Sequence, residues 1–264
     1  MVVKIRTILL TFDIEEFDLP LEFKEKIPEK DQFEISKNGT EKIIGLLNKN
    51  NVKATFFVSA KFAKQYPELI KTISEYYEVG LHCFEHKDDY SKMNEEELYE
   101  RIKNGKEIVE DIINKKVLGF RAPRFKFQNY DVLKSLKIKY DCSLNPTYIP
   151  GRYNNISKER GIHLNKGVIV VPLTVSPILR MPLFWFTFRN LPLIYPKLIT
   201  LRSKYICINF HPWEFTDIKK FKVPFLIKRN TEKILLQKLD SYIRWGVNHG
   251  FGFSEIEDYL SDIL

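Results

Sequence analysis

The chain has 264 residues, of which 44% are hydrophobic and 29% charged, and its formal net charge is +8. This composition fits one α/β domain with a sizeable core, and no apolar run is long enough to span a bilayer. The basic residues carry no helix-turn-helix, zinc-finger or RNA-binding signature, so we expect no nucleic acid partner. Cys83, Cys142 and Cys207 form no CxxC pair, which favours three buried thiols in a cytoplasmic protein.

The chain begins with a basic and apolar stretch, MVVKIRTILLTFD, which Asp13, Glu15 and Glu16 interrupt. No small-residue cleavage site follows, so we interpret this stretch as a first strand and not as a signal peptide. Beyond it, short apolar runs alternate with helical patterns, and several runs are continuously apolar, as strands buried on both faces are. The predicted strands are Arg6–Phe12, Val52–Ser59, Glu78–Cys83, Val117–Phe120, Lys139–Ser143, Val168–Val175, Tyr205–Phe210 and Phe251–Ser254.

The helical stretches carry apolar residues at helical spacing, and Gly250 supplies a stop signal after one of them. Because strands alternate with helices, and seven or eight such units fit the length, we expect a parallel barrel. A doubly wound open sheet is the alternative, although no GxGxxG or P-loop sequence supports a nucleotide site. The predicted helices are Asn38–Asn50, Asn94–Asn114, Thr231–Asn248 and Glu255–Leu264.

The segment Ser176–Arg202 departs from this alternation, since it is rich in proline, aromatic residues and arginine and has no clean period. One interpretation is an ordered insertion that packs on the barrel. The other is an apolar and basic surface that meets a lipid or a lipid-linked substrate. We therefore expect a single domain over residues 1–264, with an insertion at about 176–202.

Acidic residues follow the first predicted strand, in the sequence TFDIEE that ends at Glu16. Barrel strands carry active-site residues at their C-terminal ends, and acids beside a buried strand are costly unless they bind a ligand or face solvent. Strand alternation directs Asp13 and Glu15 to the same side. A solvated loop is the alternative for this segment taken alone.

The strongest local pattern is HCFEH, from His82 to His86, at the end of the third predicted strand. A histidine pair at i and i+4 converges on one side if the chain turns helically here. Two imidazoles and one carboxylate, with a fourth position open, form a familiar catalytic zinc site. The alternative is two surface or capping histidines.

Two further segments follow predicted strands. Arg121, in the sequence RAPRF, comes at a strand end, where a guanidinium can orient a carboxylate through paired hydrogen bonds. His211, in the sequence NFHPWE, is a candidate acid or base because the ordinary pKa of histidine is ~6.5. Each of these residues is weak evidence alone, but a barrel would bring all four segments to one face.

Taken together and in this order, the segments resemble the polysaccharide deacetylase family, also called the NodB-homology or carbohydrate esterase 4 group. The resemblance implies a distorted seven-stranded (β/α) barrel. It also implies a hydrolase that removes an N-acetyl or similar N-acyl group from a sugar. The matching segments, which span roughly Ile5 to Glu214, are TFDIEE, the strand Ala54–Val58, HCFEH, RAPRF, a weaker Tyr140–Ser143, and NFHPWE.

The resemblance implies a role for each matching residue. Asp13 would be the general base and His211 the general acid, while Arg121 would hold Asp13 and Asp141 would hydrogen-bond His211. Where the family has a second, metal-binding aspartate, this chain has Ile14, and some relatives use a later acid instead. The implied metal ligands are therefore His82, His86 and Glu15, with Glu16 as the fallback.

Zinc is the first choice of metal, and a His/carboxylate set also accepts Co, Ni, Fe or Mn. Candidate substrate contacts are Pro123, Phe125 and Trp213, with Tyr148 and Tyr153 as further aromatic faces, although core packing explains aromatic residues too. The expected partner is an N-acylated saccharide, free or lipid-linked. We expect this saccharide to be a cytoplasmic intermediate of a surface polysaccharide or glycolipid. We expect the protein itself to make peripheral contact with the inner face of the membrane.

Two other functions stay open. Other branches of the superfamily hydrolyse cyclic amides such as allantoin, some of them without metal. A catalytically inactive barrel that binds carbohydrate is the third hypothesis. The complete set of acids, histidines and arginine argues against it, because a binding module does not need such a set.

Overall fold

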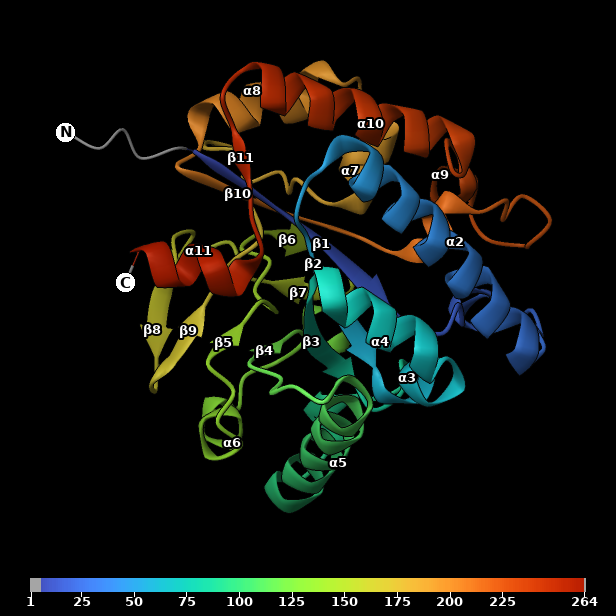
Figure 1. Cartoon of the computed structure of the whole chain (residues 1–264), viewed down its shortest axis with the longest axis vertical. Coiled ribbons are helices and arrows are strands. Elements are labelled where there is room, and N and C mark those ends of the chain that lie inside the picture. Colours follow the sequence, from blue (N-terminus) through green and yellow to red (C-terminus); the bar gives the residue numbers. More distant parts are fainter. Residues whose placement is uncertain (1–5, 264) are drawn as a thin grey trace.

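The computed structural model describes residues 6–263 and shows a curled, mostly parallel sheet with helices outside it (Figure 1). The sheet has the order β10-β1-β2-β3-β4-β5-β9-β8, and β11 pairs with β1. A separate hairpin joins β6 to β7. The strands are β1 (Thr7–Ile14), β2 (Thr55–Ser59), β3 (Glu78–Cys83), β4 (Gly119–Phe120), β5 (Tyr140–Asp141), β6 (Tyr148–Ile149), β7 (Tyr153–Asn154), β8 (His163–Asn165), β9 (Val168–Val170), β10 (Tyr205–Phe210) and β11 (Gly252–Phe253).

Strand β1 is central, and it is buried along almost its whole length, which explains its continuous apolar run. It pairs in parallel with β10, β2 and β11. At the far end of the sheet the chain curls back toward β10. There the Thr174 amide, after β9, donates to the Cys207 carbonyl of β10 at 3.0 Å. The prediction of a distorted barrel is therefore confirmed, and the doubly wound alternative is wrong.

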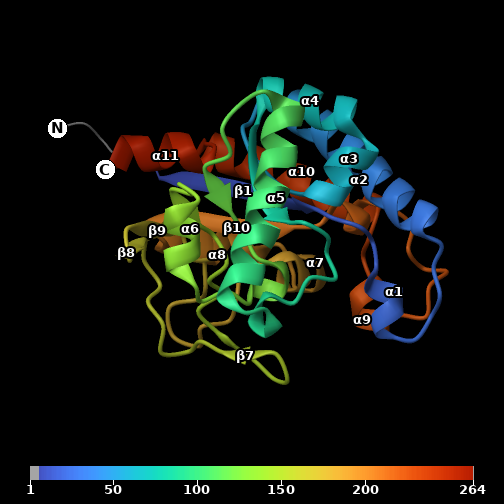
Figure 2. The same ribbon diagram turned by 90° about the horizontal axis from the view of Figure 1, so that it is seen from below.

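The helices cover the outside of the sheet, as Figures 1 and 2 show from two sides. Within residues 6–263, every helix is too short or too polar to cross a bilayer. The α-helices are α1 (Leu19–Glu22), α2 (Glu29–Asn50), α3 (Ala60–Gln65), α4 (Pro67–Tyr76), α5 (Glu95–Ile113), α6 (Tyr130–Ser135), α7 (Trp185–Asn190), α8 (Ile194–Arg202), α9 (Phe225–Lys228), α10 (Lys233–Asn248) and α11 (Ile256–Ile263). Short 3₁₀ turns follow as η1 (Tyr90–Lys92), η2 (Pro123–Phe125) and η3 (Pro212–Phe215).

Several boundaries differ from the sequence prediction. Helix α2 begins at Glu29 and not at Asn38. The sequence pattern missed its first turns because they are mostly polar and bury only Phe33 and Ser36. The predicted strand Val168–Val175 is shorter, since Pro172 has no amide hydrogen to donate to a neighbouring strand. Leu264, the last residue of the predicted C-terminal helix, lies outside the described residues. The predicted burial of the three cysteines is confirmed, and all three are unpaired.

The segment 176–202 forms two helices, α7 and α8, that are part of the packed structure. Phe188 of α7 is fully buried, with its ring centroid 5.0 Å from that of Phe210 and 5.4 Å from that of Tyr242. In the loop before α7, Ile178 and Leu179 are instead 90% and 79% exposed. The segment therefore combines a buried anchor with an exposed apolar tip.

Helix α2 approaches η3 closely through Gly39, where an added Cβ would overlap the carbonyl oxygen of Pro212. We expect Gly39→Ala to lower the free energy of unfolding by about 1–3 kcal/mol, the usual cost of overpacking. Gly45→Ala on the same helix is the matched control, because a Cβ there meets open space, and we expect it to raise stability by about 0.5–1 kcal/mol. Urea unfolding of both variants tests this, and equal effects would contradict the close contact.

Candidate metal and catalytic site

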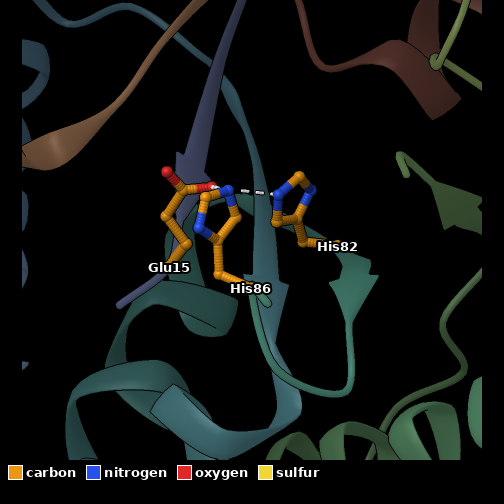
Figure 3. A group of neighbouring side chains, drawn as sticks. All are labelled: Glu15, His82 and His86. Carbon is orange, nitrogen blue, oxygen red and sulfur yellow. Dashed lines mark hydrogen bonds and ion pairs between the residues drawn. The ribbon is translucent and has the colours of Figure 1, made fainter. Parts of the chain in front are cut away.

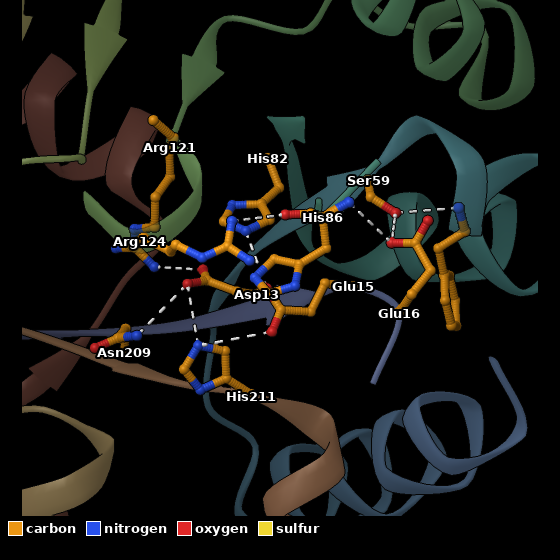
Figure 4. Close-up of polar contacts among 12 residues, drawn as sticks. Asp13, Glu15, Glu16, Ser59, His82, His86, Arg121, Arg124, Asn209 and His211 are labelled. Atoms are coloured by element: carbon orange, nitrogen blue, oxygen red, sulfur yellow. Dashed lines mark hydrogen bonds and ion pairs between the residues drawn. The ribbon is translucent and has the colours of Figure 1, made fainter. Parts of the chain in front are cut away.

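Four segments that lie far apart in the sequence meet at the C-terminal ends of the parallel strands. They are the ends of β1, β3 and β10 and the loop after β4, and their side chains converge in Figure 4. Together they line a cavity of about 340 Å³. The parallel register of the sheet places them there, since the ends of parallel neighbours lie at one edge.

Glu15, His82 and His86 form a group whose potential ligand atoms all lie within 4.8 Å of one another (Figure 3). The Glu15 Oε2 atom lies 3.0 Å from His82 Nε2 and 3.2 Å from His86 Nε2. Two atoms bound to one tetrahedral zinc at ~2.0–2.1 Å lie ~3.3 Å apart, so these separations fit a shared ion. Two imidazoles and a buried carboxylate also match the donors that such an ion prefers.

Asp18 holds His86 in place, since its Oδ1 atom lies 2.7 Å from His86 Nδ1. This contact leaves Nε2 free to face Glu15, as expected of a carboxylate that orients a metal-binding histidine. Sequence reasoning missed Asp18. The signal for it was a fourth acid two residues after Glu16, within the same turn that follows β1.

The Glu16 side chain points away from the two imidazoles, toward the start of α3 (Figure 4). Its carboxylate accepts hydrogen bonds from the Ser59 hydroxyl at 2.9 Å and from the His86 amide at 3.4 Å. Strand alternation explains why adjacent acids diverge in this way. The fallback assignment of Glu16 as a ligand therefore does not fit the structure, and Glu15 is the acid that faces the imidazoles.

Asp13 lies at the floor of the cavity and is paired with Arg121. Arg121 Nη1 donates to Asp13 Oδ1 at 2.7 Å, and both side chains are almost fully buried. The second oxygen of Asp13, Oδ2, lies 3.5 Å from Asn209 Nδ2 and 3.9 Å from His211 Nε2. Burial lowers the pKa of Arg121, but Asp13 together with Cys142 and Cys207 outweighs burial and raises it. Arg121 therefore stays protonated beside Asp13.

His211 is held by Glu214, which sequence reasoning did not single out. His211 Nδ1 lies 3.1 Å from Glu214 Oε1, so Nε2 faces the cavity. Glu214 Oε2 in turn accepts a hydrogen bond at 2.8 Å from Arg189 of α7, and both side chains are fully buried. Burial lowers the pKa of His211, but Glu15 and Glu214 outweigh burial and raise it.

The expected hydrogen bond from Asp141 to His211 is wrong. Asp141 accepts hydrogen bonds from the Ser143 amide at 3.0 Å and from the Tyr130 hydroxyl at 3.3 Å. Tyr130 belongs to α6, so Asp141 faces this helix, and it does not line the cavity. His211 finds its acid three residues away within its own turn, so no distant carboxylate is needed.

The walls of the cavity are largely aromatic and aliphatic. Of the expected substrate contacts, Phe125 and Trp213 line the cavity, whereas Pro123 is buried in η2 and does not. Tyr153 also lines the cavity, and Tyr148 does not. Residues that sequence reasoning missed complete the wall: Leu19, Ile149, Phe184, Trp185, Phe186 and Ile227.

A cluster of charged side chains lies at one edge of this cavity. Glu22 of α1 pairs with Arg124 at 3.4 Å and with Arg152 at 3.3 Å. Arg124 also donates to the carbonyl of His86 at 3.1 Å. These contacts therefore link helix α1, the turn that carries His86, and the hairpin of β6 and β7.

The chain was compared with known proteins. The sequence profile described as "Polysaccharide deacetylase" matches residues 2–141, just over half of the chain. A peptidoglycan-N-acetylmuramic acid deacetylase, PdaA of Bacillus subtilis, is 38% identical over 119 residues, which cover 44% of this chain and 45% of that protein. The matches therefore span less than half the length of the curated relatives.

Two solved structures share the fold over nearly the whole chain. One, from Mycobacterium smegmatis and bearing the polysaccharide deacetylase name, has a TM-score of 0.68 at 16% identity and covers 98% of this chain and 90% of that one. The allantoinase PuuE has a TM-score of 0.67 at 17% identity, with the same coverage of 98% and 90%. At such identities the likeness concerns the fold alone.

The arrangement of the two adjacent acids predicts that only one of them affects metal binding. We expect Glu15→Gln to weaken Zn²⁺ binding by more than the ~10–100-fold that loss of an outer partner costs. Glu16→Gln is the matched control and should bind Zn²⁺ like the parent, because its carboxylate faces Ser59. Calorimetric titration with Zn²⁺ tests this, and equal losses in both variants would contradict the assignment.

Metal uptake should depend on pH through His86. Burial lowers the pKa of His86, but Glu15 and Asp18 outweigh burial and raise it to about 9. Below that pH the imidazole carries a proton that a metal must displace. We therefore expect uptake to release a proton, and apparent affinity to rise with pH until about 9 and then level off. Titrations in buffers of different ionisation enthalpy count the protons, and a pH-independent affinity would contradict this.

Proposed function

The chain belongs to the polysaccharide deacetylase family, and from this premise we propose that it is a metal-dependent hydrolase that removes an N-acyl group from a saccharide. The acyl group we propose is acetyl or a close relative of it. The family match and the cavity at the strand ends support this proposal together.

The observation that carries the proposal is the environment of Glu15. Its carboxylate is buried and its ion-pair partners are the imidazoles of His82, His86 and His211. Burial raises the pKa of Glu15, but these imidazoles outweigh burial and hold it well below its usual range. A buried carboxylate needs a positive partner. Protonated imidazoles provide one in this structure, and a divalent cation held by neutral imidazoles would provide one as well, so the group suits such an ion.

Amide hydrolysis needs an activated carbonyl, an activated water and a proton for the leaving amine. Glu15, His82 and His86 would hold a divalent metal, which we propose is zinc, and such an ion would polarise the carbonyl and lower the pKa of water. Asp13 is the proposed general base. Arg121 occupies its Oδ1 atom, which leaves Oδ2 to accept the proton of the attacking water.

His211 is the proposed general acid. Glu214 accepts a hydrogen bond from Nδ1, so the Nε2 atom that faces the cavity can donate its proton to the departing amine. The raised pKa of His211 supports this role, because the imidazole must be protonated near neutral pH. Arg189 and Glu214 position His211 without touching the substrate.

We propose that the substrate is an N-acylated sugar in the cytoplasm, an intermediate of a surface polysaccharide or glycolipid that is free or lipid-linked. A relative named as a peptidoglycan deacetylase supports the sugar. Three buried and unpaired cysteines support a reducing compartment. The aromatic walls of the cavity suit the apolar faces of sugar rings.

Acetate release from N-acetylated sugars, measured beside the ring opening of allantoin, tests the proposal. We expect release of acetate that requires Zn²⁺ and falls by ~10²–10⁴-fold in Asp13→Asn, which keeps the shape of the side chain but cannot take a proton. Asp141→Asn is the matched control, since Asp141 contacts Tyr130 and Ser143 outside the cavity. Ring opening without acetate release would instead assign the cyclic-amide reaction.

A further inference from the structure

Exposed apolar side chains lie on two helices that border the candidate site. Helices α1 and α9 both line the cavity, α1 with Leu19 and Glu22 and α9 with Ile227, and they lie side by side in Figure 2. On the outer side of the same two elements, large apolar side chains face solvent. These are Leu21 and Phe23 at α1, and Phe225 and Leu226 of α9, which are 68% and 48% exposed.

The two helices form one packed unit, which we call the rim. Leu19 and Ile227 pack against the same buried cluster, which includes Phe17, Trp213 and Phe221. This shared core joins the rim to the cavity wall, because Trp213 also lines the cavity.

The exposed side chains of α9 are fixed in their outward direction by backbone contacts. Asn190 of α7 donates to the carbonyl of Leu226 at 3.0 Å, and Glu25 accepts a hydrogen bond from the Lys222 amide at 2.6 Å. Arg189 also donates to the carbonyl of Ile227. The helix therefore cannot turn its apolar face inward without breaking these bonds, and two adjacent large apolar residues stay in water.

Positive charge is concentrated around this apolar tip. Residues 217–229 have the sequence DIKKFKVPFLIKR, with five basic residues and one acid. Lys219, Lys220 and Lys222 are exposed, as is Arg229. Lys228 instead folds back, donating to the carbonyl of Phe221 at 2.9 Å. Exposed lysines thus precede Phe225 and Leu226 in the sequence, and the exposed guanidinium of Arg229 follows them.

We propose that the rim docks the protein on an anionic lipid bilayer, with Phe225 and Leu226 entering the interface and the surrounding lysines contacting lipid headgroups. Peripheral proteins are held on such membranes by burial of apolar side chains and by attraction of basic residues to anionic headgroups, and this surface offers both. The charge complementarity favours an anionic surface over a neutral one. Because both helices of the rim border the cavity, docking would bring the cavity close to the bilayer, where a substrate with a lipid tail could enter.

This inference rests on the surface and not on the reaction proposed above, so it can be tested by binding alone. The full chain is mixed with vesicles of phosphatidylcholine, with or without phosphatidylglycerol, and floated on a density gradient. We expect flotation only with phosphatidylglycerol vesicles, and weaker flotation as salt is raised, because salt screens the lysines. Equal flotation with both vesicles, or none with either, would overturn the proposal.

Two variants change different parts of the rim. Phe225→Ser with Leu226→Ser removes the apolar tip, and Lys219→Glu with Lys220→Glu and Lys222→Glu reverses the charge. We expect each to weaken vesicle binding by about tenfold or more, with an unchanged melting temperature. None of these residues lines the cavity.

The matched control is Ile178→Ser with Leu179→Ser, which removes two exposed apolar residues from the segment 176–202. Neither residue lines the cavity. We expect this variant to float like the parent. Loss of flotation in the control, with normal flotation of the α9 variant, would overturn the rim as the docking surface and assign contact to the other loop.

Discussion

The buried guanidinium of Arg121 sets the arrangement on which the site depends. A cation without water is stable only when its charge is balanced and its N–H groups have acceptors. Arg121 meets both needs by donating to Asp13 and Thr11 of β1 and to the carbonyl of Cys142 after β5. It therefore ties strands that are distant in the sequence to one another, and it fixes one oxygen of Asp13 while leaving the other toward the cavity.

Arg121 balances the charge of Asp13, and the remaining acids of the cavity hold the imidazoles in place. Glu15 and Asp18 hold His86 from its two nitrogens, at 3.2 Å and 2.7 Å. Glu214 holds His211 through one nitrogen, Nδ1, at 3.1 Å. His86 and His211 thus each have one nitrogen held by an outer carboxylate and one directed to the centre, which is the arrangement that both metal binding and proton transfer require. The outer nitrogen of His82, Nδ1, has no such partner among the described residues.

The segment 176–202 connects the chemistry to the surface. Arg189 of α7 donates to Glu214, which positions His211, and also to the carbonyl of Ile227 in α9. Trp185, on the same helix, lies with its ring centroid 5.6 Å from that of His211. A part of the chain with no regular sequence period therefore supports the proposed acid, forms the cavity wall and anchors the rim.

The sequence by itself determined the alternation of strands and helices, and with it the edge where TFDIEE, HCFEH, RAPRF and NFHPWE lie. Strand ends can be read from sequence because burial on both faces imposes a continuous apolar run. Only the tertiary structure decided that Glu214 and not Asp141 holds His211, that Asp18 holds His86, and that Glu16 turns away. The physical reason is that hydrogen-bond partners depend on the directions of side chains in tight turns and on which strands the curl brings together, and neither leaves a periodic pattern in the sequence.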